Sequence, residues 1–190
     1  NIHINAGAGL PADGAGGEGF DNAAETLFIS PIHAEKYLEA AKIALNYAFQ
    51  EPRSRQRFVT AEPGEKLTAE QAGRKVLTTF LPRAFRRPVK AEEIERYMRL
   101  FAAAQKRGDS YDDSLSYALQ GVLVSPHFLF RITSPNLGEG PRLLDNYEIA
   151  SRLSYFLWGT MPDDRMLEMA GEGKFHDELR LREQVTQMLW

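Results

Sequence analysis

The chain has 190 residues, 43% hydrophobic and 26% charged, which is an ordinary globular composition, and its formal net charge is -3. This charge, with no run of five like charges, gives no general attraction for phosphate backbones and makes nucleic acid a poor partner. The absence of cysteine excludes disulfides, thiolate metal sites, cysteine nucleophiles and Cys-x-x-Cys-His haem attachment within this chain.

The N-terminal region predicts a loop. Residues 6–19 contain six glycines and one proline, which no regular element interior accommodates. Gly14, Gly16 and Gly19 have Gly-x-Gly-x-x-Gly spacing, but no strand precedes them, so the match is a coincidence of composition. Residues 1–5 are the sole candidate for a strand.

The first half of the chain predicts helices joined by polar connections. Ser30-Pro31 supplies an N-cap with proline at the first helical position, and predicts a helix to Phe49. Residues 50–67 are polar and predict a connection. The capping box Thr68-Ala69-Glu70-Gln71 then predicts a helix that Pro82 should kink or end.

The clearest helix of the sequence follows Pro88. Gly108 is placed to cap its C-terminus. Its apolar residues have the i, i+3, i+4, i+7 spacing of one helical face: Ile94, Tyr97, Met98 and Phe101.

A further helix follows Asp109 or Ser110, either of which can cap it, and Ser125-Pro126 interrupts it. A short apolar segment, residues 128–132, comes next. Residues 133–143 contain two glycines and two prolines and predict a linker.

The C-terminal region predicts three more helices. Asp145 with Glu148 forms a capping-box-like start to a helix that Gly159 ends, with Phe156 expected on its core face. A short helix opens at Pro162-Asp163-Asp164 and ends near Gly171. The last helix follows His176-Asp177, and we expect further chain or a partner to cover its apolar face: Val185, Met188 and Leu189. The fold class is therefore all-α, an irregular helical bundle with long loops and a glycine-rich N-terminal segment.

Several phrases of the sequence resemble the planctomycete cytochrome-associated domains of unknown function. They occur in family order at residues 20–22, 27–31, 35–41, 80–88, 123–131 and 147–158. The resemblance implies that residues 1–50 are the tail of a first domain, 68–132 a complete second domain, and 144–190 the start of a truncated third. The chain is then an internal fragment of a large protein.

The same resemblance carries expectations about compartment and cofactor. Members are typically long exported proteins, often with a c-type cytochrome domain, so the resemblance implies a periplasmic or other extracytoplasmic location. Since this chain has no cysteine, we expect no cofactor within it, and any haem c belongs elsewhere in the parent protein. The family supplies no established catalytic residue.

His127 is the candidate catalytic residue. It follows Ser125-Pro126 in an apolar run, where an imidazole could act as an axial haem ligand or a general base. A half-buried histidine with satisfied nitrogens is the favoured interpretation. The four histidines lack the paired spacing of a zinc site, so no metal site is expected.

Three arginines are the candidate ligand-binding residues. On a continuing helix Arg83, Arg86 and Arg87 would share a face, where guanidinium groups could bind a carboxylate, a sulfate or a haem propionate. Pairing with nearby acids or with helix C-terminal carbonyls is the favoured alternative.

These patterns favour a helical structural and interaction module of an exported, cytochrome-associated protein. Its expected partners are the remaining domains of the parent chain, or envelope and redox proteins. The alternative is part of an extracytoplasmic redox or polysaccharide-degrading enzyme, with His127 and the arginines at its site. Apolar stretches fall short of the roughly 18 residues that cross a bilayer, so no membrane span is expected.

Overall fold

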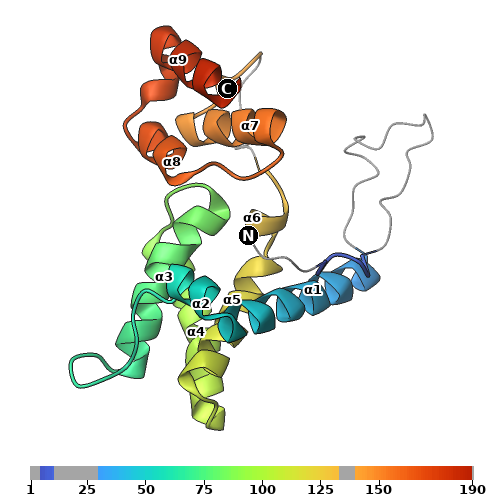
Figure 1. Ribbon diagram of the computed structural model, residues 1–190, viewed down its shortest axis with the longest axis vertical. Helices are drawn as coiled ribbons and strands as arrows, with labels where there is room; N and C mark the ends of the chain where they lie inside the picture. Colours follow the sequence, from blue (N-terminus) through green and yellow to red (C-terminus); the bar gives the residue numbers. More distant parts are fainter. Residues whose placement is uncertain (1–4, 11–29, 133–139, 190) are drawn as a thin grey trace. The chain divides into compact units, whose positions relative to one another are not determined.

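The computed structural model describes residues 5–10, 30–132 and 140–189. Within these ranges the chain is all-α, as predicted, and its only β pairing is an isolated bridge between Gly64 and Leu67 (Figure 1). Its helices are α1 (Pro31–Gln50), α2 (Pro52–Phe58), α3 (Ala69–Phe85), α4 (Ala91–Arg107), α5 (Tyr111–Leu123), α6 (Pro126–Leu129), α7 (Asn146–Trp158), α8 (Asp164–Gly171), the short 3-10 helix η1 (Lys174–His176) and α9 (Glu178–Leu189). Residues 1–4 of the considered strand and most of the glycine-rich loop lie outside the described residues.

The capping residues begin and end helices as the sequence predicts. The Ser30 hydroxyl accepts a hydrogen bond from the backbone N–H of His33 at 3.2 Å. Asp145 and Glu148 form a complete capping box at the start of α7, and Gly159 ends that helix with φ of 65°. These side chains satisfy backbone groups that a helix end leaves unpaired, which is why the boundaries are predictable.

The start of one helix was not predicted, and one of the two outcomes expected at Pro82 does not occur. Residues 50–67 are not only a connection, since Pro52 starts α2 and the Glu51 carboxylate accepts from the backbone N–H of Ser54. Pro82 does not end α3, which continues to Phe85. Helix α3 ends where Arg86 adopts a left-handed φ of 57°.

The residues cluster into two compact units. Unit 1 comprises residues 1–78 and 91–125, and unit 2 comprises residues 79–90 and 126–190. The border between them crosses α3, so this helix contributes residues to both units.

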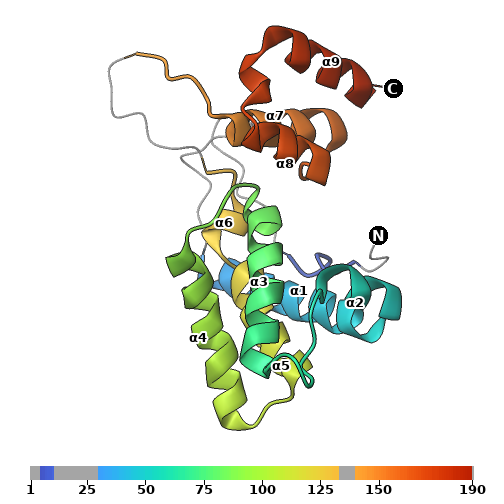
Figure 2. The ribbon, with the colours of Figure 1, turned by 90° about the vertical axis from the view of Figure 1, so that its left-hand side faces the viewer.

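In unit 1, α5 packs against both α4 and α1 (Figure 2). Gly73 of α3 lies so close to α4 that a Cβ atom there would approach the Phe101 ring to 3.0 Å. The core is made of fully buried side chains from α3, α4 and α5: Val76, Leu77, Phe101, Leu115, Leu119 and Val122. Burial of this apolar face is the main source of stability for helices of such length.

An ion-pair cluster connects α2 to α5 within unit 1. The Arg55 guanidinium donates to both carboxylate oxygens of Asp112, at 3.1 and 2.9 Å, and also pairs with Glu62. The Tyr111 hydroxyl donates to the carbonyl of Ala61 at 2.8 Å, and burial raises the Tyr111 pKa to about 12. These contacts hold the connection between α2 and α3 against α5.

In unit 2, α7, α8, η1 and α9 enclose a small separate core. Its buried residues are Ala150, Met166, Ala170, Phe175 and Met188. The indole N–H of Trp158 donates to the carbonyl of Met188 at 3.0 Å, which joins the ends of α7 and α9.

Two expectations for the C-terminal helices are wrong in part. Phe156 does not lie on the core face of α7 but is 84% exposed, because the buried stripe of this helix runs through Ala150, Ser151 and Ser154. Met188 is covered by elements of the chain itself, whereas Leu189 is 64% exposed.

Candidate functional site

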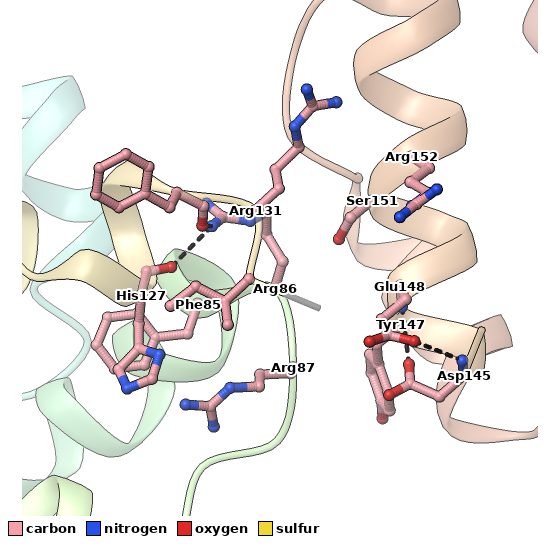
Figure 3. Close-up of a pocket in the computed structure, with 12 residues that line it drawn as sticks. Phe85, Arg86, Arg87, His127, Arg131, Asp145, Tyr147, Glu148, Ser151 and Arg152 are labelled. Carbon is pink, nitrogen blue, oxygen red and sulfur yellow. Dashed lines mark hydrogen bonds between the residues drawn. The ribbon is translucent and has the colours of Figure 1, made fainter. Parts of the chain in front are cut away.

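A cavity of about 500 Å³ lies within unit 2. Its walls come from the end of α3, from α6 with the segment after it, and from the start of α7 (Figure 3). The lining is rich in arginine and aromatic side chains: Phe85, Arg86, Arg87, His127, Phe130, Arg131, Ile132, Asp145, Tyr147, Glu148, Ser151 and Arg152.

Arg86 is a buried charged residue with its guanidinium bonded to backbone carbonyls. Its side chain is 5% exposed. One terminal nitrogen donates to the carbonyls of Ala84 at 3.1 Å and Phe128 at 3.2 Å, and the other to those of His127 at 2.7 Å and Phe130 at 2.9 Å. The planar guanidinium is suited to this, because it presents several donors in a rigid arrangement. Arg86 therefore joins the end of α3 to the backbone of residues 127–130.

His127 lies at the pocket wall as a partly buried residue. Its ring is tilted by 50° against the Phe85 ring, with 5.3 Å between their centroids. Its backbone carbonyl accepts from Arg86. Figure 3 shows the imidazole beside Phe85 and well apart from Ser151, on the α7 wall.

The other two candidate arginines, Arg83 and Arg87, lie in different surroundings. Arg83 does not line the pocket, and its guanidinium pairs with Asp164 at 2.9 Å. Arg87 lines the pocket, lies 5.6 Å from the centroid of the Phe85 ring, and donates to the Pro88 carbonyl at 2.9 Å. Since α3 ends at Phe85, the helical face expected to join Arg83, Arg86 and Arg87 is not formed.

Two arginines that sequence reasoning did not select complete the cationic lining. Arg131 lies 5.3 Å from the centroid of the Tyr155 ring, and Arg152 is exposed on α7. In the part of the chain that the structure describes, neither has a carboxylate partner. Twenty sequence positions and a linker separate the two residues, so no local spacing could indicate that they face one cavity.

The two acids of the pocket are engaged at the start of α7. Glu148 accepts two hydrogen bonds from the Arg142 guanidinium, at 2.9 and 2.8 Å, and one from the backbone N–H of Asp145. Asp145 accepts from the backbone N–H of Glu148 at 2.8 Å. The acids therefore stabilise the helix start and its preceding loop.

Within residues 5–10, 30–132 and 140–189, no group of three or more His, Asp or Glu side chains gathers in a way that could hold a metal ion. Among the helices in these ranges, none has the length and apolar character needed to cross a bilayer.

Three family models match successive parts of the chain. PSD3, a protein of unknown function (DUF1587), matches residues 1–50; PSD5, a protein of unknown function (DUF1595), matches residues 72–132; and PSD4, a protein of unknown function (DUF1592), matches residues 144–190. These three domains of unknown function are present in the chain. No curated protein and no solved structure matches it.

Proposed function

We propose that this chain is a helical structural and interaction module of a longer exported protein of the cytochrome-associated planctomycete type. The resemblance of its sequence phrases to those domains supports the protein type and the extracytoplasmic location. Its partners are then the other domains of the parent chain, or envelope and redox proteins. The three matched domains carry no assigned reaction.

The hydrogen bonds of Arg86 to backbone carbonyls are the main support for a structural role. A guanidinium that donates to four backbone carbonyls has little capacity left for a substrate. His127 contributes its carbonyl to the same arrangement and packs its ring on Phe85. Both residues stabilise the backbone around the cavity.

The enzymatic alternative gains no support from the pocket. Nucleophilic catalysis by serine requires a base within hydrogen-bonding reach. Ser151 and His127 lie on different walls of the cavity (Figure 3), so they do not form such a pair in the described structure. The Ser151 side chain is also buried.

Replacement of His127 in the full-length protein tests this proposal. His127→Ala should lower the free energy of unfolding by about 1–3 kcal/mol through lost packing. Any haem absorption spectrum of the parent protein should stay unchanged, because the ring has a structural role. The measurements are urea unfolding and the Soret band. An altered Soret band or midpoint potential at unchanged stability would instead make His127 a functional ligand.

A further inference from the structure

The cavity of unit 2 has an excess of positive charge. Four arginines line it, at positions 86, 87, 131 and 152, against the two acids Asp145 and Glu148. Glu148 is already paired with Arg142, which is not among the lining residues. The local field therefore favours an anion.

The guanidinium N–H groups of Arg131 and Arg152 are available to bind a ligand. The two terminal nitrogens of Arg86 already donate to four carbonyls, whereas Arg131 and Arg152 are exposed and have no carboxylate partner in the described ranges. They line one cavity from different elements, the segment after α6 and helix α7. Two guanidinium groups placed in this way suit an oxyanion, because each can donate parallel N–H bonds to two oxygens.

The remaining lining is apolar and aromatic. Phe130 is 40% exposed and Ile132 is 53% exposed, so both present apolar surface, and Phe85 and Tyr147 add ring surface. A volume of about 500 Å³ is within the range of pockets that bind small organic molecules. A bare inorganic anion would leave this apolar surface uncovered.

We propose that this pocket binds a small organic anion, in which a carboxylate is joined to an apolar or aromatic body. Arg131 and Arg152 bind the carboxylate, and the side chains of Phe130 and Ile132 contact the body. This binding activity goes beyond the proposed structural role and does not depend on it.

Calorimetric titration of the full chain with three probes tests the site. The probes are 2-naphthoate, its neutral amide 2-naphthamide, and inorganic phosphate. We expect 2-naphthoate to bind about tenfold or more tightly than either of the others, since only it supplies both charge and apolar surface. Equal affinity for naphthoate and naphthamide, or for naphthoate and phosphate, would overturn the proposal.

Matched variants locate the binding. Arg152→Gln should weaken naphthoate binding about tenfold without loss of folding, because this side chain is exposed and makes no ion pair in the described ranges. Arg182→Gln makes the same change of charge on α9, where Arg182 pairs with Glu178 away from the pocket lining, and should leave affinity unchanged. Unaltered affinity in Arg152→Gln, or equal weakening in both variants, would refute the site.

Discussion

Tyr111 is a residue whose ionisation is linked to folding. Burial is the largest cause of its raised pKa, and the charges of Asp112 and Glu62 add to it. The folded state thus favours the neutral hydroxyl, which donates to the Ala61 carbonyl. Its contribution is fully present below the ordinary tyrosine pKa of about 10 and is lost as pH rises from there through about 12.

Tyr111→Phe tests this linkage. The variant should be less stable than the wild type at pH 8, because the hydrogen bond is lost. The difference in stability should narrow by pH 11, because Tyr111 is then largely ionised in the unfolded wild type but still mostly neutral in the folded one, which favours unfolding of the wild type. Urea unfolding of both proteins at the two pH values gives the comparison. A difference that stays constant or widens with pH would contradict the raised pKa.

At the level of single residues, the sequence selected part of the pocket and misassigned the roles within it. His127 was selected for its place in an apolar run, and Arg86 and Arg87 for a shared helical face; all three line the cavity. The sequence could not show that the Arg86 side chain is buried. Arg86 is buried because the chain turns at its left-handed φ and brings the carbonyls of residues 127–130 around its guanidinium. That arrangement depends on tertiary contacts, which no local pattern specifies.

At the level of helices, contact between α3 and α4 depends on a missing side chain. Gly73 lies within α3, where alanine would ordinarily be more stable by about 1 kcal/mol. Here a Cβ would meet three atoms of the Phe101 ring, at 3.0, 3.1 and 3.3 Å. Phe101 is 1% exposed and packs edge-on against Tyr111, so it has little room to move.

Gly73→Ala should therefore destabilise the chain by about 1–2 kcal/mol, because overpacking outweighs the gain in helix propensity. Gly64→Ala is the control, since a Cβ there has nothing within 4 Å, and it should change stability little. Thermal unfolding followed by circular dichroism compares the two. A stabilised Gly73→Ala variant would show that α4 yields easily at this contact.

Helix starts were predictable because local side chains make the caps, as with Ser30, Ser110 and Asp145. The buried faces of the helices were less predictable than their starts. Phe156 was assigned to the core because its helical spacing from Ile149 and Leu153 places it on their stripe, yet the buried residues of α7 are small ones: Ala150, Ser151 and Ser154. Close packing of helices can require small side chains, so the stripe of large apolar residues does not coincide with the most buried face of α7.

At the level of the whole molecule, compact units and family matches divide the chain differently. The second family match covers residues 72–132, whereas the structural border crosses α3 and assigns residues 79–90 to unit 2 with the C-terminal helices. The all-α class followed from sequence periodicity and caps. The partition into two units did not, because it depends on contacts between residues far apart in the chain. The predicted three-domain division stays a prediction.

The central claim is that Arg86 stabilises unit 2 rather than binding a ligand, and urea unfolding followed by tryptophan fluorescence tests it most directly. Both tryptophans, Trp158 and Trp190, follow residue 140, so the signal reports the C-terminal part of the chain. Arg86→Met should lower the free energy of unfolding by about 3 kcal/mol, because four carbonyls lose their donor. Arg87→Met, the control beside it, should cost far less, because its side chain is only partly buried. Equal stability of Arg86→Met and the wild type would contradict the account.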